Sequence, residues 1–322
     1  MTPIELNLDS TVLGRSGCIK NLVQTIIGSV ESPTEGGFSH PNLSVNLVYG
    51  IGVHKFLDLM YRTKGDYKIA SDEAVKLFDK IPKIEDKKRP WLMSSIHLRT
   101  TCHMVWSSYV EEDATFEVIA LGDKPATEQT FSFIYYEDQY VKINLCGTID
   151  TVGRFKNGPY AIRDWKTTSA NDEGYYFTQY EMSRQLRIYT IACKIMAQRY
   201  PDSILGKIGA THMGAFIDAI FLSKNPNDTT FARSDVFQYK QKQLDDFQLT
   251  LDGVCKRVSE AVKTGYIPKE GLVAGLCERS FGDNKSAKCD FWVPCKLDGE
   301  VESVILRRDF IRKPFNPLAY NS

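Results

Sequence analysis

The segments VKINLCGTID (residues 141–150) and YAIRDWK (residues 160–166) decide the fold of this chain. Polar and apolar residues alternate in both, which is the pattern of a β-strand with one buried face. The sequence KNGP at 156–159 separates them and is typical of a tight turn. We therefore predict a β-hairpin in which Asp150 converges with Asp164 and Lys166, because the last two share one face of their strand.

These three side chains suit the hydrolysis of phosphodiester bonds. Two carboxylates supply hard oxygen ligands for Mg²⁺ or Mn²⁺, which binds phosphate oxygens and lowers the pKa of a bound water. A lysine beside the metal can orient the attacking water or stabilise negative charge on phosphorus. The tripeptide pattern alone is not specific, since it recurs in polar stretches at Glu85/Lys87, Asp86/Lys88 and Asp283/Lys285. A surface salt bridge is the competing interpretation.

The spacing of apolar residues predicts helices before the hairpin and a mixed pattern after it. Helices are expected at Cys18–Ile27, Leu47–Met60, Ser71–Ile81 and Trp91–Val110. Further strands are expected at Thr115–Leu121, Glu128–Tyr136, Lys207–Leu222 and Phe231–Tyr239. One long helix is expected over about Glu173–Arg199, with Met182 on its buried stripe, and another around Leu244–Val258. This order predicts an α/β or α+β core preceded by a helical insertion.

The bulk composition excludes little. With 322 residues, 43% of them hydrophobic, the chain can build one large domain with a sizeable core. Forty basic and forty acidic residues cancel, so nucleic acid would have to be held in a local groove instead of by a diffuse positive field. No signal peptide or membrane span is expected. Eight cysteines without a secretion signal favour reduced thiols or metal ligation in a cytoplasmic protein.

Four motifs in a fixed order carry a family resemblance. They are YGIGVH at 49–54, GTID at 147–150, AIRDWKTT at 161–168 and QLRIY at 185–189. Together they resemble the PD-(D/E)XK nuclease superfamily, and within it the RecB-like exonuclease branch, which includes CRISPR-associated and phage-encoded iron–sulfur exonucleases. The order of the four motifs is specific, although each motif alone is not. The resemblance covers about Leu47–Tyr189.

The resemblance implies an α/β, restriction-endonuclease-like core, with a mixed central sheet flanked by helices and an N-terminal helical insertion. The expected domains are a helical region at 1–114, which carries Cys18 and His54, the nuclease core at 115–264, and an irregular cysteine-containing tail at 265–322. The tail is expected to pack back on the N-terminus.

The same resemblance assigns roles to individual residues. The implied metal ligands are His54, Asp150, Asp164 and the backbone carbonyl of Trp165. The implied catalytic residues are Asp150, Asp164 and Lys166, with Gln185 and Tyr189 supporting the site and positioning the DNA strand. Glu128, at the head of its strand, resembles an accessory acidic position. The alternatives are a core histidine for His54, a surface amide for Gln185 and a core aromatic for Tyr189.

The cysteines resemble the ligands of a [4Fe–4S] cluster that staples the two ends of many RecB-like nucleases. In that arrangement one cysteine precedes the core and three follow it, and thiolates suit such clusters. Cys18, Cys289 and Cys295 fit, but Ser286 stands where the family has the remaining ligand, so Cys277 is the candidate. Zinc on the same four sulfurs is one alternative, and the other is that Cys277, Cys289 and Cys295 are small loop or core thiols.

DNA is the expected partner, bound as a single strand or at a duplex end. Arg184 and Arg187 flank Gln185 and could reach phosphates, and a basic, aromatic cluster at 307–315 could grip a single strand or be a solvated tail. The expected function is a Mg²⁺- or Mn²⁺-dependent DNA exonuclease that leaves 5′-phosphate ends, in DNA repair, recombination or phage DNA processing. The alternative is a non-catalytic nucleic-acid-binding or iron–sulfur structural protein on the same fold.

Overall fold

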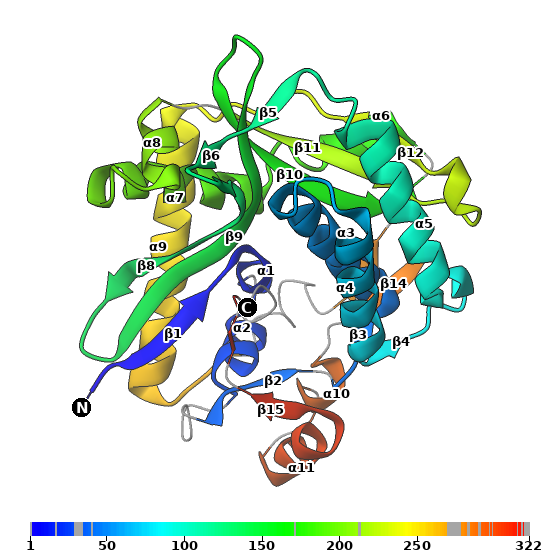
Figure 1. Cartoon of the computed structure of the whole chain (residues 1–322). Helices are drawn as coiled ribbons and strands as arrows, with labels where there is room; N and C mark the ends of the chain where they lie inside the picture. The colour runs from blue at the N-terminus through cyan, green and yellow to red at the C-terminus, as the bar shows by residue number, and fades with distance from the viewer. Residues whose placement is uncertain are drawn as a thin grey trace. The chain divides into compact units, whose positions relative to one another are not determined.

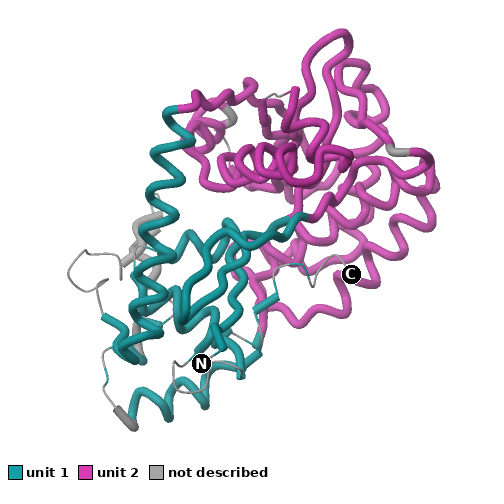
Figure 2. The backbone as a smooth tube through the Cα atoms, turned by 90° about the vertical axis from the view of Figure 1, so that its left-hand side faces the viewer, with its two compact units in different colours: residues 1–41, 131–147, 242–322 teal, residues 42–130, 148–241 magenta. Residues whose placement is uncertain are grey.

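The computed structural model describes residues 2–16, 18–28, 35–39, 41–170, 172–211, 214–268, 278–281, 284–288, 291–295, 297, 299–313, 315–316 and 318. The chain divides into two compact units, and each is assembled from segments that are distant in sequence (Figure 2). Unit 1 comprises residues 1–41, 131–147 and 242–322, and unit 2 comprises residues 42–130 and 148–241. Strands β8 (Thr127–Glu137) and β9 (Val141–Phe155) run through both units.

Unit 1 joins the N-terminal segment to the C-terminal segment. Strand β1 (Ile4–Leu8) pairs in parallel with the first part of β9, from Ile4 opposite Val141 to Leu8 opposite Leu145. Strand β15 (Ile311–Lys313) pairs with β2 (Gly37–Ser39). A small core beside them is formed by Phe38, Phe291, Leu306 and Phe310. The other elements of unit 1 are α1 (Ser10–Leu13), α2 (Ile19–Ile26), α9 (Gln241–Thr264), β13 (Glu278–Phe281), β14 (Asn284–Lys288), α10 (Trp292–Cys295) and α11 (Gly299–Asp309).

Unit 2 contains a mixed sheet flanked by helices (Figure 1). Its N-terminal elements are β3 (Leu43–Ser44), α3 (Val45–Arg62), α4 (Tyr67–Lys80), β4 (Lys83–Ile84), η2 (Pro90–Met93), α5 (Ser95–Val105), η3 (Trp106–Val110), β5 (Phe116–Val118), β6 (Ala120–Leu121) and β7 (Lys124–Pro125). Its later elements are β10 (Tyr160–Thr168), α6 (Glu173–Thr178), α7 (Arg184–Arg199), α8 (Ile204–Thr211), β11 (Gly214–Phe221), η4 (Pro226–Asp228) and β12 (Thr230–Arg233).

The predicted hairpin is confirmed. Strand β10 pairs antiparallel with the second part of β9, from Tyr160 opposite Arg154 to Arg163 opposite Thr151. On its other edge β10 pairs in parallel with β11, which in turn pairs antiparallel with β12. Helices α3 and α8 contact β10, and α7 contacts β11. The fold class is therefore α/β, with a mixed central sheet between helices, as the sequence predicts.

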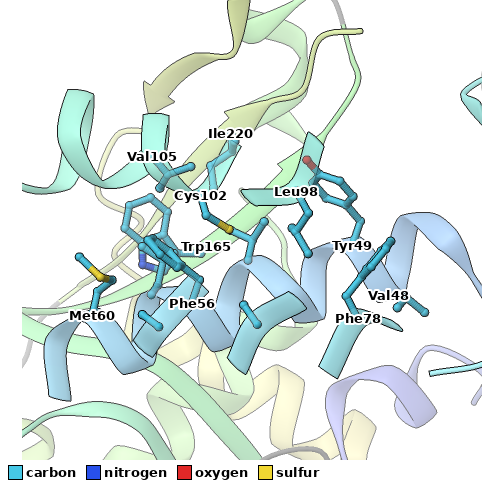
Figure 3. Packing of buried hydrophobic residues seen from close by; sticks show 14 of the residues in the cluster. Val48, Tyr49, Phe56, Met60, Phe78, Leu98, Cys102, Val105, Trp165 and Ile220 are labelled. Carbon is cyan, nitrogen blue, oxygen red and sulfur yellow. The ribbon is translucent and has the colours of Figure 1, made fainter. Parts of the chain in front are cut away.

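A hydrophobic core lies where helices α3, α4 and α5 pack against β10 and β11 (Figure 3). Trp165 of β10 and Ile220 of β11 are buried among these helices. Gly52 allows α3 to approach α5 closely, because a Cβ there would lie 2.8 Å from Cδ2 of Leu98. The helix predicted at Leu47–Met60 is thus confirmed as α3, and its buried face fixes it to the strand that carries Asp164.

The single helix predicted over Glu173–Arg199 is wrong. The segment forms two helices, α6 and α7, because Ser183 caps a new helix: its hydroxyl accepts a hydrogen bond of 3.3 Å from the Leu186 N–H. Met182, predicted to be buried, precedes this cap and is 59% exposed. The strand predicted from Lys207 begins only at Gly214, since α8 occupies Ile204–Thr211.

Three further corrections concern one strand that is shorter than predicted and two elements that the sequence does not predict. The strand predicted at Phe231–Tyr239 is shorter, since β12 ends at Arg233. The sequence did not predict β1, and the tail expected to be irregular contains α11. None of the helices in the described ranges combines the length and apolar character that a membrane span requires.

Candidate active site

Two aspartates and a lysine meet where β9 and β10 pair. The register that sets Arg163 opposite Thr151 brings the next residue of β10, Asp164, to the level of Asp150. The Trp165 N–H donates a hydrogen bond of 2.7 Å to Oδ2 of Asp150, which ties that carboxylate to β10. Asp150 is 9% exposed and Asp164 is fully buried. The alternation of side chains along two paired strands thus produces the convergence that the sequence predicts.

His54 reaches the same place from helix α3. This helix runs close to β10, since a Cβ on Gly50 would lie 3.1 Å from Oγ1 of Thr167. His54 Nε2 lies 3.0 Å from the backbone oxygen of Trp165, and His54 Nδ1 lies 3.4 Å from Oδ1 of Asp150. The imidazole therefore stands between a carboxylate and a carbonyl, both offered by the hairpin.

Glu128 completes the acidic site, which comprises His54, Glu128, Asp150, Asp164 and Lys166. One ligand atom each from His54, Glu128 and Asp150 lies within 4.8 Å of the others. Glu128 has a φ of 46°, in the left-handed region that non-glycine residues seldom adopt. Strain of this kind persists only where surrounding contacts impose it, and it is frequent at functional sites. From the sequence, Glu128 is only a weak resemblance to an accessory position, because a strand pattern does not reveal a local reversal of φ.

The contacts beside Glu128 account for its conformation. The hydroxyl of buried Thr127 donates a hydrogen bond of 2.6 Å to Oδ1 of Asp58. Asp58 lies one turn after His54 on α3 and also accepts a 2.6 Å bond from Nε of Arg62. His54, Asp58 and Arg62 recur every four residues, so they share one face of the helix. This four-residue spacing is the sequence pattern that indicates Asp58 lies on the same helix face as His54.

Asp164 has one carboxylate oxygen without a partner. Its Oδ1 is buried and accepts no hydrogen bond from the part of the chain that the structure describes. The Lys166 ammonium forms an ion pair with Oδ2 of Asp164. A buried carboxylate with unsatisfied lone pairs is costly, so the site is built for a further cationic or donor group.

The electrostatics of the site reflect an excess of acidic groups. Burial and the neighbouring Asp150 carboxylate raise the pKa of Glu128 to about 8. Burial also raises the pKa of Asp164 to about 6, although the Lys166 ammonium opposes this. Burial would raise the pKa of Asp150, but His54 outweighs it and the pKa of Asp150 is lowered.

The pKa values of the two basic groups are raised as well, although burial acts on them in the opposite direction. Burial alone would lower the pKa of His54, but the Asp150 carboxylate raises it to about 9. Burial would also lower the pKa of Lys166, but Asp164 and Asp150 raise it. Without another cation, His54 therefore keeps a proton and serves as the counter-charge of Asp150.

Helix α7 supplies the predicted glutamine and tyrosine. Gln185 Nε2 donates a hydrogen bond of 2.7 Å to the hydroxyl of Tyr189, one turn along the helix. Tyr189 is buried, and burial together with the Asp164 and Asp150 carboxylates raises its pKa far above the usual value. The tyrosine hydroxyl therefore faces the acidic groups.

Of the two arginines predicted to contact DNA, one is hydrogen-bonded within the chain and the other is exposed. Arg187 donates a 2.6 Å hydrogen bond to the backbone oxygen of Met182, so its guanidinium is engaged by the chain that precedes α7. Arg184 begins α7 and is exposed.

Sequence reasoning missed two tyrosines of the segment after β10. The hydroxyls of Tyr176 and Tyr180 lie 2.9 Å apart. Burial is the main reason that the pKa of each is raised; the Lys166 ammonium lowers the pKa of Tyr176, and the Asp164 carboxylate raises that of Tyr180. The Tyr176 hydroxyl is also hydrogen-bonded to Thr168, which lies two residues after Lys166 on β10. One continuous helix, which the apolar spacing predicts here, gives no reason to place these two tyrosines at the site.

The cysteines divide into two groups. Cys102, Cys146, Cys193 and Cys255 are buried in the core, and burial raises the pKa of all four thiols. Of the predicted cluster ligands, Cys18 is the N-cap residue of α2 and Cys295 is buried beside Phe291, both within unit 1. Cys277 and Cys289 lie outside the described residues.

The residues of the acidic site fit a divalent cation. The Trp165 oxygen lies 3.0 Å from His54 Nε2, so both groups could be ligands of one cation. Carboxylates suit Mg²⁺ and Mn²⁺, and imidazole suits transition metals. The unsatisfied Oδ1 of Asp164 lies on the adjoining strand and would be satisfied by positive charge. An added cation would balance the three carboxylates.

Comparisons with known proteins agree with this chemistry. A search of the solved structures finds, among others, one described as "Crystal structure of SSO0001", with 12% sequence identity over 66% of this chain and 77% of that chain and a TM-score of 0.26. The curated proteins contain no match. The PD-(D/E)XK nuclease superfamily matches residues 33–295, which include all of the acidic site. The chain belongs to the PD-(D/E)XK nuclease superfamily.

Proposed function

We propose that the protein is a Mg²⁺- or Mn²⁺-dependent DNA exonuclease of the RecB-like branch. The observation that carries this proposal is the convergence of His54, Glu128 and Asp150, within 4.8 Å, beside the ion pair of Lys166 with a buried carboxylate. The order of the four sequence motifs supports the RecB-like assignment and the exonuclease mode. The biological role that we propose is DNA repair, recombination or phage DNA processing.

In this proposal the metal is held by His54, Asp150, Asp164 and the Trp165 carbonyl, with Glu128 as a further acidic ligand. The bound cation supplies Lewis-acid polarisation of the phosphate and a lower pKa for an attacking water. The family membership gives a nuclease, and the carboxylate-rich donor set is the kind that hard divalent cations prefer.

Lys166 has the charge and position of the catalytic lysine. Its ammonium contacts Asp164, and the Lys166 side chain as a whole is 23% exposed, so the side chain faces the site and is still reachable from solvent. An ammonium there can orient a water molecule and stabilise negative charge as it develops on the phosphate. The Tyr189 hydroxyl, held by Gln185, can donate to the same region and position the strand. Arg184 can contact a neighbouring phosphate.

We further propose a [4Fe–4S] cluster on Cys18, Cys277, Cys289 and Cys295. Support comes from the sequence pattern and from Cys18 and Cys295 belonging to the same compact unit. Anaerobically purified protein should be brown, absorb visible light and contain iron. Colourless protein with stoichiometric zinc, or with neither metal, would contradict the cluster without affecting the nuclease site.

The nuclease proposal is tested by digesting end-labelled single- and double-stranded DNA with Mg²⁺, Mn²⁺ or EDTA. We expect cleavage with either metal, none with EDTA, and 5′-phosphate ends released progressively from a terminus. Lys166→Met and Asp164→Asn should abolish cleavage, whereas Lys156→Met, at an exposed lysine of the neighbouring turn, should not. Cleavage by all three variants would refute the site, and binding without cleavage by the wild type would favour the non-catalytic alternative.

A further inference from the structure

Helix α6 lies at the end of β10 that carries Lys166. In the parallel pairing of β10 with β11, Phe221 lies opposite Thr168, two residues after Lys166. The ring of Tyr176 packs edge-on against the ring of Phe221, with centroids 5.4 Å apart. The first residues of the chain beyond β10 therefore turn back over the strand ends next to the acidic site.

Two hydroxyls of this segment are linked to β10. Those of Tyr176 and Tyr180 are 2.9 Å apart and form one hydrogen bond with each other, and the Tyr176 hydroxyl is also hydrogen-bonded to Thr168, two residues after Lys166. When Thr168 donates to Tyr176 and Tyr176 donates to Tyr180, the Tyr180 proton is left for an added acceptor. A phosphate oxygen beside Lys166 is an acceptor of the right kind.

An exposed ring adjoins this pair. Tyr175 is 79% exposed, the highest value among the exposed large apolar or aromatic side chains in the described part of the chain. Its backbone oxygen accepts a 2.8 Å bond from the Thr178 hydroxyl, and the Ser183 N–H donates a 3.0 Å bond to the Tyr180 oxygen. The segment is therefore a compact series of turns, in which Tyr175 is the residue next to Tyr176.

We propose that Tyr175, Tyr176 and Tyr180 bind the unpaired nucleotides of a single-stranded DNA end whose neighbouring phosphate lies at the acidic site. The Tyr175 ring stacks on a base, and the Tyr176–Tyr180 pair donates to a phosphate oxygen. This inference rests on the proposed function and adds the form of its substrate. Stacking requires an exposed base face, which a duplex hides between its base pairs.

The charge of the chain favours this substrate over a continuous duplex. With no net charge, the protein cannot rely on an extended positive field to neutralise the many phosphates of double-stranded DNA. Stacking on aromatic rings contributes affinity without requiring further cations. The exposed Arg184 and Met182, at the far end of the same segment, extend the surface along which a flexible strand can run.

The test measures binding without cleavage, in EDTA, by fluorescence anisotropy of a labelled oligo-dT strand and of a blunt duplex. Tyr175→Ala should weaken single-strand binding at least about fivefold and leave duplex binding unchanged. Tyr175→Phe should bind like the wild type. Tyr200→Ala, at a tyrosine of the same unit that is 55% exposed, should have no effect.

A second readout reports stacking itself. Oligo-dT strands carrying 2-aminopurine near either end should lose fluorescence on binding wild-type protein and Tyr175→Phe, but not Tyr175→Ala. Unchanged binding and quenching by Tyr175→Ala would overturn the inference, and so would an equal loss for single strand and duplex. Selective loss of single-strand binding by a protein that never cleaves DNA would retain the inference and reject the nuclease function. If the wild type cleaves DNA and Tyr175→Ala does not change single-strand binding, the nuclease function is retained and the inference is rejected.

Discussion

Thr127 donates a 2.6 Å hydrogen bond to the Asp58 carboxylate, and this bond joins the residue before Glu128 to the helix that carries His54. Two of the proposed metal ligands are therefore positioned through one buried contact. Thr127→Val keeps the shape of the side chain and removes its donor. We expect the variant to bind Mn²⁺ about tenfold more weakly, since supporting residues of metal sites have effects of this size.

Isothermal titration calorimetry with Mn²⁺ measures this without any DNA. Thr130→Val, at an exposed threonine of the same strand, is the matched control and should bind like the wild type. Combining Thr127→Val with Glu128→Gln should add little to the loss caused by Glu128→Gln alone, because both act through the same ligand. Wild-type affinity in Thr127→Val would show that Asp58 does not position Glu128.

The buried Asp164 carboxylate should destabilise the metal-free protein. Its pKa is raised from 3.8 to about 6, chiefly by burial. Between these values the unfolded chain has released a proton that the folded chain retains, so folding becomes less favourable as pH rises through this window. In EDTA at pH 8, we expect Asp164→Asn to melt about 2 °C or more above the wild type.

Mn²⁺ should reverse this order, because it binds the folded wild type and stabilises it by mass action. Differential scanning calorimetry with EDTA or Mn²⁺ makes the comparison. If Asp164→Asn melts below the wild type in EDTA, the carboxylate stabilises the empty site and the argument from burial is wrong.

His97 should make unit 2 sensitive to mild acid. Its Nε2 lies 2.9 Å from the Ser223 carbonyl and donates to it, and its Nδ1 lies 2.7 Å from the Tyr49 hydroxyl, which donates its own proton to Thr101. Burial lowers the pKa of His97, although its backbone hydrogen bonds oppose this. As pH falls below 6.5, the unfolded chain gains a proton before the folded chain does, so stability present above 6.5 is lost.

Urea unfolding of the wild type and His97→Gln from pH 8 to 5 tests this. The stability advantage of the wild type over the variant should shrink as pH falls. His103, which is exposed on the same helix, provides the control variant His103→Gln, whose difference from the wild type should not vary with pH in the same way. A difference in stability between the wild type and His97→Gln that does not change with pH would refute the lowered pKa of His97.

Gly52 tests how closely α3 must pack. Alanine there gains about 1 kcal/mol of helix propensity, but its Cβ would lie 2.8 Å from the buried side chain of Leu98. Overpacking costs about 1–3 kcal/mol, so we expect Gly52→Ala to lower stability and to weaken Mn²⁺ binding by displacing His54. Gly253→Ala, in α9, meets nothing within 4 Å among the described residues and should be neutral or stabilising. Denaturant titration of both variants gives the comparison.

The hairpin and its acidic pair could be predicted because their information is local. Alternation of side chains, the KNGP turn and the spacing of Asp164 and Lys166 fix which groups share a face. The position of His54 required the family resemblance, since nothing local to α3 indicates that Gly50 brings the helix against β10.

Other features depended on contacts that no local pattern encodes. The left-handed φ of Glu128 goes with the bond between Thr127 and Asp58, which are 69 residues apart. The break between α6 and α7 depended on a serine cap inside a sequence whose apolar spacing suited one long helix. Because that break was missed, Tyr176 and Tyr180 were not considered as part of the site.

The pairing of Ile4 with Val141 has a consequence for synthesis on the ribosome. Strand β1 is made before β9, with which it pairs, and unit 1 also needs residues from 242 onward, whereas every segment of unit 2 has been made by residue 241. Unit 2, which carries the acidic site, can therefore fold while unit 1 is still incomplete. Strand β1, although it is made before every segment of unit 2, belongs to the unit that is completed later.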